Sequence, residues 1–190
     1  MLAIRDLTHV LAVLNAATIV VLLVAYRRIR GDIVFGRLSP GQKLTLDRMK
    51  EAYGASVSTL REILNRLSSE GLIVAEGARG FEVMPVSPDD LRQIASMREL
   101  LEGHALISAC GSRVLLDTHA TIYDRYLRYQ MIAAVYRGEA ASGEHRRLLD
   151  SALARDWRAA QKTLGTHIQD CVTQMLRGGL IAKAARVAVR

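Results

Sequence analysis

Closely spaced glycines divide residues 36–86 into short pieces, and this division most limits what the chain can fold into. A glycine follows each of two helical patterns, and further glycines lie between two short apolar runs. In chain order, these pieces predict two helices and two strands, at 46–53, 56–69, 72–74 and 81–84. A short helix, a turn, a second helix and a glycine-bounded hairpin are the plan of a winged helix-turn-helix.

A third helix is expected ahead of these pieces. The apolar pattern at 24–35 places two isoleucines on one face, and Gly36 supplies a stop. The Ser-Pro-Gly sequence at 39–41 then predicts a turn. Thr45 and Ser56 have the short polar side chains that cap helices, so each is expected to begin one helix of the motif.

The helix expected at 56–69 has two faces of different chemical character. Its apolar face is a stripe that we expect to be buried, formed by Val57, Leu60, Leu64 and Leu67. In a helix-turn-helix, the first residues of the second helix contact base edges, where hydroxyls and arginine find hydrogen-bond partners. The side chains expected to contact DNA here are Ser56, Ser58, Thr59 and Arg61. The alternative is that Arg61 pairs with Glu62 or Glu51 and that the serines only cap the helix.

The charge of the chain agrees with an acidic partner. Lysine and arginine together number 26 against 19 acidic residues, which gives a net charge of +7. Such a balance favours binding to nucleic acid or to an anionic membrane surface. Arg79, in the turn of the expected hairpin, is placed to reach a minor groove or phosphates.

No motif in the sequence predicts catalysis or a disulfide framework. Cys110 and Cys171 lie far apart and fit no zinc spacing, so a reducing cytoplasm is the expected location. The nearest histidine–aspartate pairs come without a glycine-rich loop, a nucleophile elbow or a third ligand. We therefore expect that the chain is not an enzyme.

The run VLAVLNAATIVVLLVAY at 10–26 is the most apolar part of the chain, and three arginines follow it closely. A membrane-spanning helix needs about 20 apolar residues, so the run is slightly short for that role. Three interpretations stay open: a helix that is buried or packs on a partner, a non-native extension, and a membrane anchor with the arginines on its cytoplasmic side.

Residues 26–86 resemble the amino-terminal domain of GntR-family transcriptional regulators. The segments GRLSPGQKL and GASVSTLREILNRLSSEGLIVAEGARGFEV follow each other in the family's order. The resemblance implies a regulator that binds a double-stranded DNA operator and is expected to be a repressor, with Arg48, Arg61 and Arg79 in the family's basic contact positions. The family often has arginine where this chain has Val57, so the preferred operator is expected to differ.

The remainder of the chain resembles the FCD (FadR C-terminal) subgroup of that family. The similarity lies in DDLRQIASMRELLEGHAL, GSRVLLDTHATIYDRYLRYQM and GEHRRLLDSALARDWRAAQKTLGTHI. It implies an all-helical domain that binds a small carboxylic-acid metabolite and forms a homodimer. Within this domain, Arg98 is expected to anchor the effector carboxylate by bidentate pairing.

The FCD-like part is shorter than the family pattern. FCD domains hold a divalent metal such as Zn, Ni or Mn with one aspartate and three histidines, and only His145 and His167 match two of these ligands. The helix that should carry the aspartate and the first histidine is missing, with the junction near 103–106. We expect a degenerate site that binds metal weakly or not at all, because only Glu99 or Glu102 could replace the lost ligands.

The expected fold is mainly α, with a winged helix-turn-helix of three helices plus a β-hairpin, followed by a shortened all-α bundle. Its expected parts are an apolar extension, the DNA-binding domain, the effector and dimerisation domain, and a basic tail, at 1–20, 21–86, 87–176 and 177–190. The alternative function is a membrane-associated or interaction protein, anchored by residues 10–26, with a tethered or degenerate DNA-binding domain.

Overall fold

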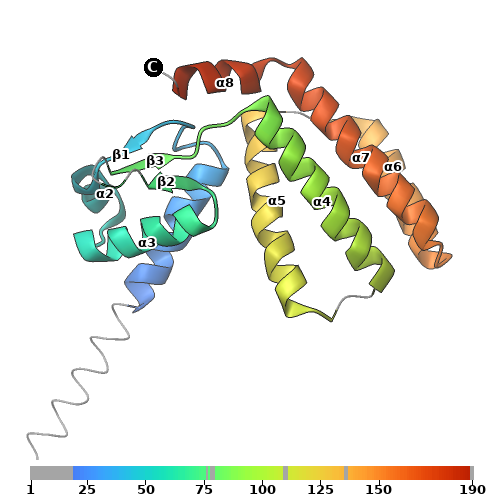
Figure 1. Cartoon of the computed structure of the whole chain (residues 1–190), viewed down its shortest axis with the longest axis horizontal. Coiled ribbons are helices and arrows are strands. Elements are labelled where there is room, and N and C mark those ends of the chain that lie inside the picture. The colour runs from blue at the N-terminus through green and yellow to red at the C-terminus, as the bar shows by residue number, and fades with distance from the viewer. Residues whose placement is uncertain (1–18, 76, 78–79, 109–110, 135–136, 189–190) are drawn as a thin grey trace, which may run out of the picture. The chain divides into compact units, whose positions relative to one another are not determined.

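The computed structural model describes residues 19–75, 77, 80–108, 111–134 and 137–188, and these residues are mainly helical (Figure 1). They form two compact units. Of the described residues, the first unit contains those at 19–33 and 37–84, and the second contains those from 85 onwards together with Val34–Gly36. The expected fold class is confirmed, since one unit combines helices with a small sheet and the other is all helical.

The first unit contains the three helices that the glycine pattern predicted. Residues 19–34 are helical, and α2 (Leu46–Tyr53) and α3 (Val57–Ser69) follow. Gly54 ends α2 with a φ of 64°, a left-handed conformation that glycine adopts without steric cost. Ser56 begins α3 as expected, because its hydroxyl accepts a hydrogen bond from the Thr59 amide. Thr45 occupies the same position before α2, but its side chain makes no capping bond.

The sheet of the first unit has one strand more than predicted. The hairpin strands are β2 (Ile73–Ala75) and β3 (Phe81–Val83), which pair antiparallel with Ile73 opposite Val83. A third strand, β1 (Lys43–Leu44), pairs with the other edge of β3, so the order is β1-β3-β2. Two residues are too few to show a strand period, which is why the sequence pattern did not reveal β1.

The buried stripe on α3 differs from the predicted one at its first residue. Leu60, Ile63, Leu64 and Leu67 are the buried side chains of this helix, each at most 1% exposed. Val57 lies at the same angular position as the stripe, but its side chain is 37% exposed. The prediction that Val57 is buried is therefore wrong, because burial requires a neighbour that covers the residue as well as the correct helical spacing.

Two of the arginines that follow the apolar amino-terminal run have partners inside the first unit. Arg30 Nε lies 3.2 Å from a Glu70 carboxylate oxygen, and the Arg28 guanidinium lies 5.2 Å from the centre of the Tyr53 ring. These contacts join the helix at 19–34 to the end of α3 and to α2. In the part of the chain that the structure describes, no helix is long and apolar enough to cross a membrane. Residues 10–18 of the run lie outside that part.

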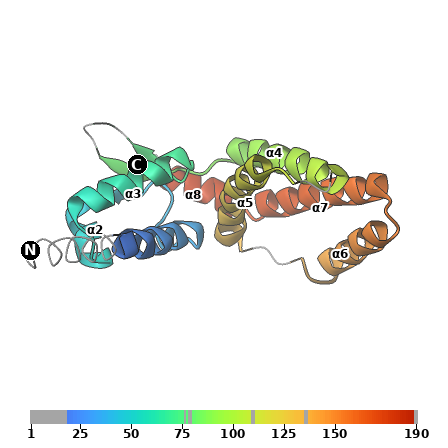
Figure 2. The same ribbon diagram turned by 90° about the horizontal axis from the view of Figure 1, so that it is seen from below.

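The second unit is a bundle of five helices within the described residues. They are α4 (Pro88–Ser108), α5 (Arg113–Ala133), α6 (Gly138–Leu153), α7 (Trp157–Arg177) and α8 (Leu180–Ala188). Helix α4 packs against α5 and α7, and α6 lies along α7 (Figure 2). The core between them includes Leu91, Ile94, Tyr126 and Ile168, all nearly inaccessible to solvent.

The carboxy-terminal segment differs from the expected basic tail at 177–190. It contains α8, which contacts α5 and α7, and Ile181 of this helix is 1% exposed in the bundle core. Ala184, one turn later, packs against the same core, whereas Lys183 and Arg186 are exposed. The basic residues predicted a solvated tail. The apolar residues between them instead make the helix amphipathic, and its apolar face packs on the bundle.

Candidate nucleic-acid interface and effector cavity

The first turn of α3 presents a group of hydroxyls to solvent. The Ser56 hydroxyl lies 2.9 Å from the hydroxyls of both Ser58 and Thr59, and it also accepts the Thr59 amide hydrogen bond at 3.2 Å. Ser56 and Ser58 are exposed. These residues therefore cap the helix and at the same time leave polar groups available to a phosphate or a base edge.

Arg61 is exposed on α3, one turn after Val57. Neither Glu62 nor Glu51, nor any other residue that the structure describes, forms a hydrogen bond or an ion pair with its guanidinium. The alternative in which Arg61 serves an internal ion pair is therefore not what the structure shows. Arg48, on α2, is likewise exposed. Arg79 lies outside the described residues.

A groove of about 790 Å³ lies between α3 and the hairpin. Val57, Arg61 and Asn65 line it from α3, and Phe81 lines it from β3. The structure thus brings Arg61 together with the hairpin, whereas Arg48 does not line this groove. Asn65 was not among the expected contacts, although its spacing of four residues from Arg61 already placed both side chains on one line of the helix.

A second cavity, of about 380 Å³, lies among the helices of the second unit. Its lining includes Arg98 from α4, His145 from α6, and His167 and Cys171 from α7, together with Arg137. The candidate effector anchor and the two candidate metal ligands therefore line one cavity. His145 is exposed and its ring centre lies 5.0 Å from that of His167.

Arg98 is buried and held from two sides. Its Nε and Nη2 donate to the two carboxylate oxygens of Glu102, at 2.5 and 3.3 Å. Its guanidinium lies 4.5 Å from the centre of the Tyr126 ring and 5.1 Å from that of Tyr123. The position of Arg98 is thus fixed. Its Nε and Nη2, which were expected to bind an effector carboxylate together, already donate to Glu102.

Arg137 and Glu144, neither of which was a candidate site residue, form a buried ion pair. The two terminal nitrogens of Arg137 donate to the two oxygens of Glu144, each at 2.7 Å. These bonds hold the pKa of Glu144 at about 2, well below its usual range. The side chains of both residues are less than 10% exposed. Arg137 directly precedes α6 and Glu144 lies on it seven residues later, so about two helical turns separate the two members of the pair.

The ion pair extends to His167 and Cys171. Glu144 lies 2.7 Å from His167 Nδ1, while the Cys171 sulfur lies 3.4 Å from Arg137 and 3.8 Å from His167 Nε2. The hydrogen bond with Cys171 raises the pKa of His167, and the bond with Glu144 raises it further, although burial opposes both. Burial raises the pKa of the Cys171 thiol, but the bonds from His167 and Arg137 outweigh it, so the net shift is downward.

This arrangement does not fit the metal that FCD domains hold. His167 Nδ1 is already bonded by Glu144, and an Arg137 nitrogen lies 3.5 Å from the same atom. A divalent cation beside it would be repelled by the guanidinium. Among the residues that the structure describes, no group of three or more histidine, cysteine, aspartate or glutamate side chains is placed to hold a metal ion.

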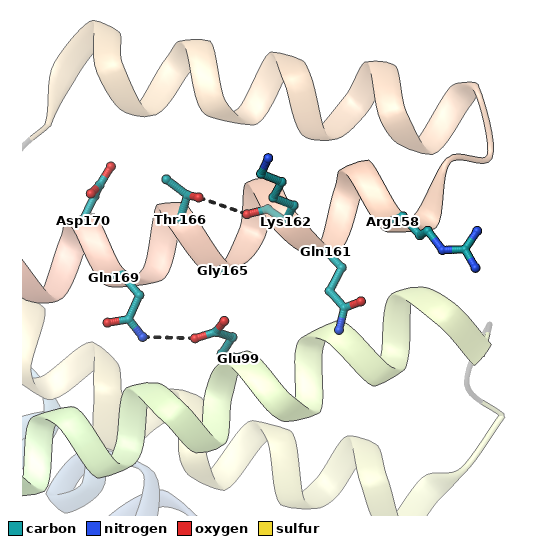
Figure 3. A pocket seen from close by; sticks show the side chains of 8 residues that line it. All are labelled: Glu99, Arg158, Gln161, Lys162, Gly165, Thr166, Gln169 and Asp170. Atoms are coloured by element: carbon teal, nitrogen blue, oxygen red, sulfur yellow. Dashed lines mark hydrogen bonds between the residues drawn. The ribbon is translucent and has the colours of Figure 1, made fainter.

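The two carboxylates that could have replaced the missing ligands have other partners. Glu102 bonds Arg98 and lies 3.0 Å from His119 Nε2. Glu99 accepts a hydrogen bond from Gln169 at 3.0 Å, at a separate groove of about 580 Å³ between α4 and α7 (Figure 3). Neither carboxylate lines the cavity that contains His145 and His167.

Profiles of two known domains cover most of the chain. The profile of bacterial regulatory proteins of the gntR family matches residues 23–83, and that of the FCD domain matches residues 89–170. Both units of the structure therefore correspond to a domain of known type.

Two curated relatives agree with these matches. The chain is 28% identical to the HTH-type transcriptional regulator BphR of Paraburkholderia xenovorans, over 82% of this chain and 85% of BphR. It is 22% identical to the HTH-type transcriptional repressor GlaR of Escherichia coli, over 75% of this chain and 90% of GlaR. The BphR alignment runs over 209 positions, more than this 190-residue chain contains, so part of BphR has no counterpart here.

Solved structures show the same fold. A putative GntR regulator from Rhodococcus superposes with a TM-score of 0.68 at 17% identity, over 80% of this chain and 95% of that one. McbR/YncC of E. coli superposes with a TM-score of 0.65 at 18% identity, over 83% and 97% of the two chains. The protein is a DNA-binding transcriptional regulator rather than an enzyme, and it belongs to the GntR family, in the subgroup that carries an FCD domain.

Proposed function

We propose that the chain is a cytoplasmic repressor that binds its operator as a homodimer and responds to a small carboxylic acid bound in the cavity of the second unit. The observation that carries the proposal is the meeting of Arg98, Arg137 and two histidines at this cavity, inside the domain that the family uses for effectors. The name of the relative GlaR supports the repressor role. The DNA contacts are assigned to Ser56, Ser58, Thr59, Arg61, Arg48 and Arg79.

The effector class follows from the charge and size of the cavity. Two guanidinium groups line it. Arg98 forms an ion pair with Glu102, and Arg137 forms one with Glu144. A volume of about 380 Å³ is at the small end of the range for ligand pockets and suits a compact acid. We assign the carboxylate to Arg98 Nη1, the guanidinium nitrogen that does not bond Glu102, in the cavity that His145 also lines.

The homodimer is supported by apolar side chains at the surface of the second unit. Leu116 of α5 is 48% exposed and Leu149 of α6 is 57% exposed. Together with neighbouring leucines, they line an open apolar groove of about 670 Å³. A second copy of the chain would remove this surface from water. Light scattering should give a dimer, and Leu149→Glu should give a monomer; a wild-type monomer that binds an operator as a single unit would contradict the proposal.

The DNA assignment is tested on operators recovered by selecting genomic fragments with the purified chain. Arg61→Ala should weaken binding by about 1–3 kcal/mol and relax specificity at one base pair, because an arginine–guanine pair is lost. Arg92→Ala is the matched control, since Arg92 is an exposed arginine of the second unit, 2.7 Å from Asp89. Equal affinities of wild type and Arg61→Ala would contradict the assignment.

The effector assignment is tested with a panel of short mono- and dicarboxylic acids. A cognate acid should raise the melting temperature of the wild type and release the operator, and Arg98→Ala should remove both effects. Arg113→Ala is the control, because the Arg113 side chain is 89% exposed at the start of α5. A cognate acid that binds Arg98→Ala as tightly as wild type would place the effector elsewhere.

A further inference from the structure

Val57 is an apolar side chain at a position where DNA-binding helices present polar ones. Among the residues of α3, all of which the structure describes, it is the one large apolar side chain that is not buried, at 37% exposed. Its neighbours Ser56 and Ser58 are both exposed and polar. The family often has arginine here, so the exposed valine changes the chemistry of the surface rather than its shape alone.

The position of Val57 relative to Arg61 is set by the helix. The two residues are four apart, so their side chains lie one above the other, and both line the groove of about 790 Å³ between α3 and the hairpin. Four residues correspond to a rise of about 6 Å, while stacked base pairs are about 3.4 Å apart. When Arg61 reaches one base pair, Val57 therefore lies beside a base pair within about two steps of it, because about 6 Å along α3 is the largest shift that the helix allows along the DNA axis.

Base edges in the major groove offer one apolar group. Guanine and adenine present acceptors, cytosine and adenine present amino donors, and thymine alone carries a methyl group, at its C5 position. Valine can neither donate nor accept a hydrogen bond, so pressing it against any other edge would leave a polar base atom without water or partner. Contact with the thymine methyl instead removes apolar surface of both groups from water.

We propose that Val57 determines operator specificity by packing against the 5-methyl group of a thymine, within about two base pairs of the guanine that Arg61 reads. The proposal rests on the placement of α3 in the major groove given above. It assigns to this chain an operator that has thymine at the base pair that Val57 contacts.

The methyl group can be removed without altering any base-pairing atom, by replacing single thymines of the recovered operator with deoxyuridine. For the wild type, one such replacement in a single half-site should weaken binding about three- to fivefold, which corresponds to the loss of one buried methyl group. At that same position, Val57→Ala should bind the thymine and uracil operators almost equally. Cytosine placed there should bind wild type more tightly when it is 5-methylated.

Two controls make the result specific. Val57→Ala should keep its melting temperature, because Val57 is partly exposed and alanine favours the helix. Val114→Ala, which truncates a valine that is 77% exposed on α5, should keep the uracil profile of the wild type. A wild type that binds its operator specifically but tolerates every uracil would overturn this inference alone, as would equal uracil sensitivity of Val57→Ala. No specific binding to any recovered fragment would overturn the DNA-binding role as well.

Discussion

The candidate site arginines of the two units lie in opposite environments. In the first unit, Arg61 and Arg48 are exposed and have no ion-pair partner among the described residues. In the second unit, Arg98 and Arg137 are buried, and each donates two hydrogen bonds to one carboxylate, from Glu102 and Glu144. An exposed unpaired charge is ready for a polyanion, whereas a buried one must be neutralised inside the protein. The exposed pair is therefore available to DNA, whereas in the second unit Glu102 and Glu144 already neutralise Arg98 and Arg137.

The largest expected effect comes from breaking the buried pair. Glu144→Ala should lower the free energy of unfolding by about 3–5 kcal/mol, because it leaves the Arg137 charge buried without its main partner. Denaturant unfolding followed by circular dichroism measures this difference. Asp117→Ala is the control, since Asp117 pairs with Arg113 at the surface and should change stability by less than about 1 kcal/mol. Equal losses of unfolding free energy in Glu144→Ala and Asp117→Ala would show that the buried pair matters no more than an exposed one.

The same pair predicts how stability depends on pH. The pKa of Glu144 is lowered from its ordinary value of 4.5 to about 2, so the folded state favours the charged carboxylate. Its contribution is therefore fully present above about pH 4.5 and is lost as the pH falls towards 2. Melting temperatures measured from pH 6 down to pH 2.5 should show a fall in wild type that is smaller in Glu144→Gln. Parallel curves for the two proteins would contradict the role of the pair.

A smaller effect is expected at the tip of the hairpin. Arg79→Ala should weaken operator binding about equally for all sequences and should reduce the slope of log affinity against log salt by about 1, because one phosphate contact is lost. Fluorescence anisotropy at several salt concentrations measures both quantities. An unchanged salt slope would show that the hairpin turn does not contact the backbone.

The smallest response is expected from metal. Calorimetric titration with zinc, nickel or manganese should give no submicromolar binding, because Glu144 already bonds His167 and the Arg137 charge lies beside it. A tight stoichiometric site that is lost in His145→Ala and in His167→Ala would show that the shortened bundle holds metal with other residues. Such a result would also mean that the second unit keeps a metal site, as FCD domains do, despite the ion pair between Arg137 and Glu144.

Local signals in the sequence were sufficient for most of the first unit. Helix α2 ends at Gly54 and α3 begins at Ser56, as their sequence predicted, because a helix stop and a capping hydroxyl act over a few residues. The prediction was wrong at Val57, where the helical period was right but neighbours leave 37% of the residue exposed. It missed β1, whose two residues gain strand geometry only by pairing with β3.

In the second unit, the sequence determined the helices and supplied candidate residues such as Arg98, His145 and His167. The Arg98–Glu102 pair spans one turn of α4, but only the tertiary structure decided the partners of the two histidines. Glu144 precedes His145 and had no assigned role, yet it neutralises Arg137 and bonds His167, which is 23 residues further along the chain. Helical periodicity describes one helix at a time and carries no information about which helices meet. Burial then decides which charges must be paired, because only a charge removed from water requires a partner inside the protein.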